Sequence, residues 1–194
     1  MRPIFFIYLG MTGAGKTTLF EHEGIGKGVD YINPDLIVKQ NNWDWRSRAN
    51  NFKAGMIALE RINQDVEDQK TFALETTAVP RKLINKAREN GFYIDIKMIV
   101  AESVDLARER IATRVSQGGH GISEDKMVAS FSRQKNNIKQ AIKMADHFVI
   151  YRNADKFRKV AEFKNACPTY IEDKETLIKK CYSEVLEEKH GLKV

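Results

Sequence analysis

Gly10-Met11-Thr12-Gly13-Ala14-Gly15-Lys16-Thr17 spells G-x-x-x-x-G-K-[ST] and follows directly on an apolar run at residues 4–9. Glycines at these positions let successive backbone N–H groups point inward at a phosphate. A helix that opens after such a loop adds the positive end of its dipole. Strand, loop and helix in this order favour a nucleotide-binding site over an ordinary glycine turn.

The loop also predicts roles for its side chains. We expect Lys16 to reach the β- and γ-phosphates of the nucleotide and Thr17 to hold Mg²⁺. The residues expected to contact the nucleotide are Gly10, Met11, Thr12, Gly13, Ala14, Gly15, Lys16, Thr17 and Thr18.

Length and charge narrow the class of protein. The 194 residues, of which 42% are hydrophobic, suit a single domain over residues 1–194. The 32 basic and 26 acidic side chains leave a net charge of +6, which a site for anionic phosphates accounts for by itself. The basic residues are dispersed without an aromatic-basic patch, so nucleic acid is not the expected partner.

Cysteine and histidine usage point to a reducing location. Cys167 and Cys181 lack C-x-x-C spacing and the four histidines are scattered, so we expect free thiols and no zinc site. The apolar start is too short for a membrane span. We therefore expect a cytoplasmic protein without a membrane partner.

Strand-length apolar runs alternate with longer stretches of helical period, which is typical of a parallel sheet with crossover helices. The expected fold is an α/β three-layer sandwich of the P-loop kinase type, with a mainly parallel sheet of about five strands. The predicted strands cover residues 4–9, 29–33, 71–75, 93–101 and 147–151. The predicted helices cover a segment opening at Lys16 and residues 46–69, 81–90, 103–116, 123–145 and 174–189.

Two helices show apolar stripes. In the long helix at 46–69 the residues that recur at helical spacing are Phe52, Met56, Leu59, Ile62 and Val66. In the last helix, at 174–189, the stripe consists of Leu177, Cys181 and Val185, and its expected role is packing, ahead of a partner surface.

Asn33-Pro34-Asp35 follows the second predicted strand. Loops at the carboxyl ends of parallel strands meet over the phosphate loop, so Asp35 should face the site. Phosphoryl transfer needs an acceptor hydroxyl that is oriented and relieved of its proton, and an aspartate suits that role. The alternative is that Asp35 caps the helix that follows. We favour the catalytic base.

Glu75 ends the third predicted strand and is followed by Thr76-Thr77. An acid at the end of a buried strand near the phosphate loop can hold the water shell of Mg²⁺ or a substrate hydroxyl. The alternative is that Thr76 or Thr77 only caps the helix beyond Pro80. We favour the functional role for Glu75.

Arginines flank a glycine-rich break at residues 118–121. A helix, such a break and a second helix are typical of a mobile lid, here at about 114–133, whose arginines close over the transferring phosphoryl group. Each arginine alone could equally be a solvated surface residue. Arg114 and Arg133 border the break most closely and are the predicted catalytic pair.

Several of these motifs together resemble the zeta-toxin family of P-loop kinases. The motifs are Asn33-Pro34-Asp35, Ala54-Gly55, Phe72-Ala73-Leu74-Glu75-Thr76-Thr77 and Arg114-Val115-Ser116-Gln117-Gly118-Gly119-His120 behind the phosphate loop. The resemblance runs over about residues 4–153. It implies ATP and Mg²⁺ as cofactors, transfer of phosphate to the 3′-hydroxyl of the sugar in UDP-N-acetylglucosamine, and an antitoxin protein as partner.

Residue by residue, the resemblance makes Asp35 the catalytic base and Lys16 with Thr17 the phosphate and metal contacts. Glu75 and Thr77 correspond to contacts on the sugar side, and Arg114 and Arg133 to lid arginines.

The chain departs from the family pattern on the substrate side. Met56 stands where an arginine often follows Ala-Gly, and Arg81, our other predicted substrate contact, stands slightly later than the family's arginine. Another small hydroxylated metabolite or a nucleic-acid end therefore stays open as the acceptor. A GTPase is disfavoured, because Asn85-Lys86-Ala87-Arg88 lacks the final acid of N-K-x-D. Trp43 and Trp45 could stack on a base or sugar, but anchoring of their loop is the favoured interpretation.

Overall fold

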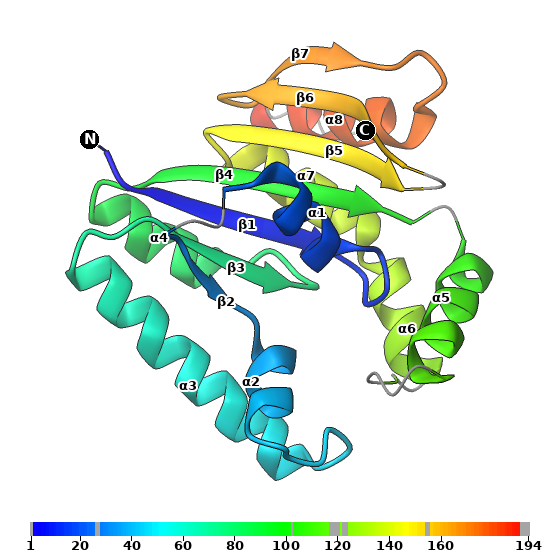
Figure 1. Ribbon diagram of the computed structural model, residues 1–194. Coiled ribbons are helices and arrows are strands. Elements are labelled where there is room, and N and C mark those ends of the chain that lie inside the picture. The colour runs from blue at the N-terminus through cyan, green and yellow to red at the C-terminus, as the bar shows by residue number, and fades with distance from the viewer. Residues whose placement is uncertain are drawn as a thin grey trace.

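A seven-stranded sheet forms the centre of the molecule (Figure 1). The computed structural model describes residues 2–25, 28–101, 103–116, 121, 124–153 and 156–190. The strands are β1 (Ile4–Gly10), β2 (Asp30–Ile32), β3 (Phe72–Thr76), β4 (Tyr93–Val100), β5 (His147–Asn153), β6 (Phe157–Lys164) and β7 (Cys167–Ile171). Their order in the sheet is β2-β3-β1-β4-β5-β6-β7. Neighbours among the first five pair in parallel, which confirms the predicted α/β class.

Helices cover both faces of the sheet. They are α1 (Lys16–Glu23), α2 (Pro34–Gln40), α3 (Arg48–Glu67), α4 (Arg81–Glu89), α5 (Val104–Ser116), α6 (Glu124–Ser132), α7 (Gln134–Met144) and α8 (Thr176–His190). In Figure 1, α1 lies in front of the sheet, whereas α4, α7 and α8 lie behind it. The result is the three-layer sandwich expected from the sequence.

Alternation along β1 builds a separate apolar core on each face. Phe5 and Ile7 belong to the cluster that includes buried residues of α3, α4, α7 and α8. Phe6 and Tyr8 point to the opposite face, where buried side chains of α1 pack. This alternation follows from the strand geometry, since successive side chains of a strand point to opposite faces of the sheet.

The prediction of about five strands is wrong, because β6 and β7 add an antiparallel hairpin to β5. Both strands interleave polar with apolar residues, and most of β7 is exposed. An antiparallel strand with one face in water lacks the continuous apolar run that marks a buried parallel strand. That difference explains why the apolar pattern missed them.

The predicted helix at 123–145 is two helices, since the chain turns at Arg133 between α6 and α7. This turn lets α7 pack on the core that contains Ile138 and Ile142, while Met127 of α6 joins the core on the other face.

The predicted apolar stripe of α3 is wrong in its first half. Ile62 and Val66 are buried, but Phe52, Met56 and Leu59 are 73%, 52% and 39% exposed. The buried face of the first half instead carries Ala54 and Ala58. Small side chains there let the helix backbone approach its neighbours closely. In α8, Cys181 and Val185 are buried and Leu177 packs half-buried against the core, as expected, and Ile178 is buried as well.

Two acids, Asp30 of β2 and Asp65 of α3, lie close together where this strand meets this helix. Arg61 of α3 forms an ion pair with Asp30 of β2. Asp65, one turn further along α3, is 7% exposed, and its Oδ2 has no hydrogen-bond partner among the described residues. Burial, followed by the charge of Asp30, raises the pKa of Asp65 to about 6. Ionised Asp65 is therefore a destabilising feature of the fold.

Over the part of the chain that the structure describes, each helix is too short or too polar to traverse a bilayer.

Candidate active site

The phosphate loop connects β1 to α1, and its glycines stand where a side chain would not fit. Gly10 has a φ of 151°, and a Cβ there would lie 2.8 Å from the carbonyl oxygen of Ile99 in β4. Gly15, the N-cap of α1, has a φ of 100°, and its Cβ would lie 2.5 Å from Nδ2 of Asn153. The backbone N–H of Ala14 donates to the carbonyl oxygen of Met11 at 3.2 Å and closes the turn.

Lys16, Thr17 and Glu75 come together at the ends of β1 and β3. Lys16 is 4% exposed, and its Nζ donates to the Met11 carbonyl at 2.9 Å and lies 3.4 Å from Oε1 of Glu75. The hydroxyl of Thr17 donates to Oε2 of Glu75 at 2.7 Å. The parallel register, which pairs Tyr8 with Glu75, brings this acid beside the loop. A cation, a hydroxyl and a carboxylate are thus in contact behind the loop.

Tyr31 of β2 is a member of this group that the sequence analysis missed. Its hydroxyl donates a short hydrogen bond to Oε2 of Glu75, and its ring stacks on Phe20 at 4.1 Å. Burial, then the negative charge of Glu75 and the hydrogen bond to it, raise the pKa of Tyr31 above its ordinary value. Tyr31 therefore stays a proton donor throughout the physiological range. The sequence held one signal: Tyr31 and Asn33 are two positions apart, so an extended strand directs both to one face.

The chemistry of this group fits Mg²⁺. That ion takes oxygen ligands and keeps several waters, so a hydroxyl and a carboxylate beside a phosphate loop suit it. Within the described part of the chain, no cluster of three or more His, Cys, Asp or Glu forms a metal cage. A metal at Thr17 and Glu75 would accordingly be shared with phosphate oxygens and water.

Asp35 lies in the first turn of α2, with its side chain exposed. The cap of this helix is Asn33, whose Oδ1 accepts from the backbone N–H of Asp35 at 2.9 Å. Capping therefore does not account for the Asp35 carboxylate. Because Ile32 pairs with Leu74, the segment that carries Asp35 leaves the sheet at the same edge as Glu75.

Thr77 and Arg81 follow β3 on the way to α4. The carbonyl oxygen of Thr77 accepts from Nδ2 of Asn137 at 3.0 Å, which ties this loop to α7. Arg81 opens α4 and is exposed. An open hollow lies beside it, lined by Val79, Pro80, Arg81, Lys82, Leu83 and Asn85. None of these lining residues belongs to the phosphate loop, so the structure does not bring Arg81 into the Lys16 group.

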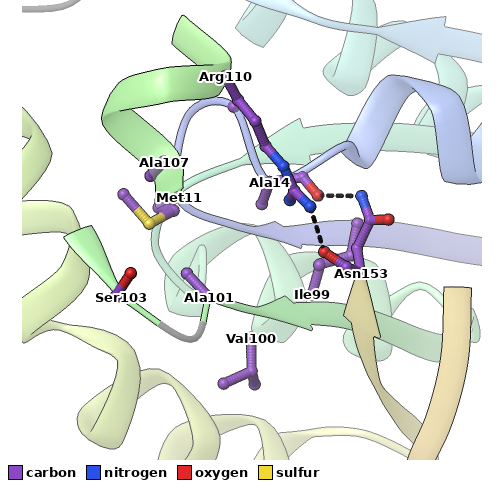
Figure 2. Close-up of a pocket in the computed structure, with 10 residues that line it drawn as sticks. Met11, Ala14, Ile99, Val100, Ala101, Ser103, Ala107, Arg110 and Asn153 are labelled. Carbon is purple, nitrogen blue, oxygen red and sulfur yellow. Dashed lines mark hydrogen bonds between the residues drawn. The ribbon is translucent and has the colours of Figure 1, made fainter. Parts of the chain in front are cut away.

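A small pocket borders the loop on the other side (Figure 2). It is lined by Met11, Gly13, Ala14, Ile99, Val100, Ala101, Ser103, Ala107, Arg110 and Asn153. Arg110 of α5 donates to the carbonyl oxygen of Asn153 at 2.5 Å, and Nδ2 of Asn153 donates to the carbonyl oxygen of Ala14 at 2.9 Å. The dashed lines in Figure 2 show this chain of contacts from α5 through β5 to the loop. The sequence placed Arg110 in the arginine run next to the predicted lid but gave no sign of its contact with Asn153.

Of the two predicted lid arginines, only the side chain of Arg133 is described. It is exposed at the start of α7, next to buried Gln134, which exchanges hydrogen bonds with the backbone of Ala101. The side chain of Arg114 lies outside the described residues, as do residues 117–120. In Figure 1, α5 and α6 lie beyond the arrowheads of β1 and β4, where a lid would cover the loop.

The loop between α2 and α3 reaches Gly121, which belongs to the predicted lid. Trp43 and Trp45 are half-buried and pack against the core, in agreement with anchoring of their loop. A Cβ on Gly121 would lie 3.1 Å from Cη2 of Trp45. The contact leaves no room for a side chain at residue 121 without movement of the indole.

The fold is that of P-loop kinases, as expected from the resemblance to zeta toxins. A structure of the PezAT chromosomal toxin-antitoxin system of Streptococcus pneumoniae has a TM-score of 0.61 at 17% identity and covers 98% of this chain and 87% of its own. A chain of the Pnkp1/Rnl/Hen1 RNA repair complex has a TM-score of 0.59 at 14% identity, over 71% of this chain and 46% of its own. A candidate kinase from Chloroflexus aurantiacus has a TM-score of 0.52 at 20% identity, over 69% of this chain and 80% of its own.

No protein-family model matches the chain. By sequence it belongs to the family of an uncharacterized protein of Haemophilus influenzae (strain Rd), with which it is 32% identical over 123 residues. The match covers 61% of this chain and 85% of that protein.

Proposed function

We propose that this protein is a kinase of the zeta-toxin type that transfers the γ-phosphoryl group of ATP to a sugar hydroxyl of a nucleotide sugar, with UDP-N-acetylglucosamine as the first candidate. The observation that carries the proposal is the group formed by Lys16, Thr17 and Glu75 directly behind the phosphate loop. The same three residue types serve phosphate and metal binding in P-loop enzymes.

Phosphoryl transfer leaves the protein mainly with positioning and charge neutralisation. Lys16 is already buried and directed along the loop, and on nucleotide binding its ammonium group would exchange the Glu75 carboxylate for phosphate oxygens. Arg133, and Arg114 with it, would add positive charge from the lid side. Bound Mg²⁺ would neutralise charge on the β- and γ-phosphate oxygens.

Glu75 fits the metal side of the site better than the sugar side. Its carboxylate accepts from Thr17, the residue that would ligate the metal, and faces Lys16. We propose that it holds a water of the metal shell. Thr77 and Arg81 remain the proposed contacts to the acceptor.

Asp35 would act as the base that takes the proton of the acceptor hydroxyl. Its carboxylate is exposed at the edge of the sheet where β2 and β3 end, and capping of α2 is already supplied by Asn33. A carboxylate in that place can orient the hydroxyl as well as accept its proton.

The side of the loop that carries this pocket is the proposed place for the adenine, because the pocket itself, about 10 Å³, is too small for a base. It adjoins Met11 and Gly13, and Arg110 presents a planar guanidinium group that can stack on a base.

Mass spectrometry after incubation with ATP, Mg²⁺ and a panel of nucleotide sugars tests the function. We expect one added phosphate on UDP-N-acetylglucosamine or a close relative. If no nucleotide sugar is phosphorylated but other hydroxylated metabolites are, the protein is a kinase and the proposed acceptor class is wrong.

A second candidate is a kinase of nucleic-acid ends. It is favoured by the net charge of +6 and by the likeness of fold to a chain of an RNA repair complex. Oligonucleotides with free hydroxyl ends belong in the same panel. A phosphorylated end, with binding that weakens steeply as salt rises, would select this candidate.

We further propose that the protein acts in the cytoplasm and has an antitoxin protein as partner. The partner is suggested by the likeness of fold to a component of the PezAT toxin-antitoxin system. An antitoxin that blocks the nucleotide site should compete with ATP, which binding of the purified partner in the presence and absence of ATP would test.

A further inference from the structure

We propose that Tyr31 is a positioning residue that fixes the carboxylate of Glu75 for metal binding and links it to the helix that carries Asp35. The inference deepens the proposed function and rests on it. Neither the phosphate-loop motif nor the zeta-toxin resemblance assigns a role to Tyr31.

The first step is the orientation of the Glu75 carboxylate. Oε2 accepts two hydrogen bonds, one from Thr17 at 2.7 Å and one from Tyr31. Oε1 lies 3.4 Å from Nζ of Lys16. Two donors on one oxygen fix the plane of the carboxylate and leave the other oxygen directed at the loop, where a metal-bound water needs an acceptor.

The second step is the rigidity of Tyr31 itself. Its ring stacks on Phe20 of α1 with an interplanar angle of 17°, and the edge of the Tyr8 ring lies against it with centroids 6.4 Å apart. The hydroxyl is therefore held in place by packing as well as by its hydrogen bond. A preorganised donor costs little ordering when the ligand arrives.

The third step is the link to Asp35. The side chains of Thr17 and Asn33 lower the pKa of Tyr31 and so offset part of the rise that burial and Glu75 cause. Asn33 is 5% exposed and caps α2, the helix that carries Asp35. Tyr31 thus hydrogen-bonds to the acid near the end of β3 and lies in the strand that runs directly into the cap of the helix with the proposed base.

Tyr31→Phe removes the hydroxyl and keeps the ring stacked on Phe20. A matched control exists in Tyr8→Phe. Tyr8 is fully buried on the same face of the sheet, and its hydroxyl donates to Oε2 of Glu23 at 2.6 Å instead of to Glu75. Both variants delete one partly buried hydrogen bond from a tyrosine to a glutamate, so a general effect on folding should appear in both.

Calorimetric titration of ATP, with Mg²⁺ and with a chelator, supplies a readout that does not depend on turnover. For Tyr31→Phe we expect Mg²⁺-dependent ATP binding to weaken by roughly 10- to 100-fold, as is usual for loss of an outer-shell partner of a metal site. Binding without metal should equal that of the wild type. Tyr8→Phe should match the wild type under both conditions, although its thermal unfolding temperature falls.

A double-mutant cycle with Glu75→Gln separates positioning from a loss of stability. If Tyr31 acts through Glu75, Tyr31→Phe should change Mg²⁺ dependence little in the Glu75→Gln background. The inference on Tyr31 would be wrong if Tyr31→Phe changed Mg²⁺ dependence equally in both backgrounds. It would also be wrong if folded Tyr31→Phe kept the Mg²⁺ dependence of the wild type. Neither result would contradict the proposed function. Failure of the wild type to bind ATP at all would instead overturn the proposed function.

Discussion

The ammonium group of Lys16 lies 3.4 Å from the carboxylate of Glu75, and both side chains are largely buried. The positive charge of the phosphate loop is therefore paired within the protein before any nucleotide arrives. In the proposed function, phosphate oxygens would replace Glu75 as the partner of Lys16, and the released carboxylate would then serve the metal.

Replacement of Lys16 should weaken both binding and transfer. Lys16→Ala removes a charged donor from the phosphates, for which we expect a loss of about 10- to 100-fold in ATP affinity. Equilibrium binding of ATP measures it. Lys39→Ala, which removes an exposed lysine of α2, is the control and should bind as the wild type does. Full affinity and activity in Lys16→Ala would defeat the assignment of the loop.

Replacement of Asp35 should separate chemistry from binding. Asp35→Asn keeps the size of the side chain but loses the base, so turnover should fall roughly 10²- to 10⁴-fold while ATP affinity stays near that of the wild type. Loss of an acid from the first turn of α2 should cost only about 0.3–1 kcal/mol of stability.

The control for this variant is Asp44→Asn, an acid in the loop after α2 whose Oδ1 caps the backbone N–H of Arg46 at 2.9 Å. Asparagine keeps that acceptor, so the control should be active. Normal turnover of Asp35→Asn on the identified acceptor would remove Asp35 from the mechanism.

Gly15→Ala should abolish nucleotide binding by distorting the loop. The added Cβ would meet Nδ2 of Asn153 at 2.5 Å, at a φ of 100° that alanine rarely adopts. Gly24→Ala is a matched control because Gly24 also has a positive φ, 65°, but nothing lies within 4 Å of its Cβ. The control should lose about 1 kcal/mol of stability and keep its ATP affinity. Equal ATP affinity in the two variants would show that the close approach at Gly15 is dispensable.

Asp65, the buried acid of α3, should make the stability of the protein depend on pH. The pKa of Asp65 rises from 3.8 to about 6 on folding, so the folded state disfavours its ionised form. Stability contributed by the protonated acid is complete at low pH and is lost as pH rises through about 6. Asp65→Asn should therefore stabilise the protein by about 1–3 kcal/mol at pH 8 and much less at pH 4.

Urea unfolding at several pH values measures this difference. Asp68→Asn is the control, since a hydrogen bond from Lys70 lowers the pKa of Asp68 and its removal should bring no gain at high pH. An Asp65→Asn stability curve parallel to that of the wild type would contradict the role of Asp65.

Features that depend on one short, continuous segment of the chain could be predicted from the sequence. The phosphate loop, the apolar strand before it and the acid that ends β3 each occupy one short segment, and the predicted parallel α/β fold is confirmed. The closeness of Glu75 to Lys16 could not be predicted in this way. It depends on the register between β1 and β3, and the sequence of neither strand alone determines that register.

Contacts between distant segments could not be predicted. Tyr31 meets Glu75 across 44 residues, and Arg110 meets Asn153 across 43. A tyrosine in a short strand resembles an ordinary core residue until its neighbours are known. On α3 the large apolar residues Phe52 and Met56 led to a wrong prediction of the buried face. That face is built from alanines, which contribute little to an apolar pattern.

The hairpin of β6 and β7 also decides how the sheet ends. Without it, β5 with its apolar Phe148, Val149 and Ile150 would be the outermost strand, a ready template for a strand of another molecule. The strand at this edge is instead the five-residue β7, in which Pro168 removes a backbone donor. The hairpin thus disfavours edge-to-edge aggregation at the side of the sheet opposite β2.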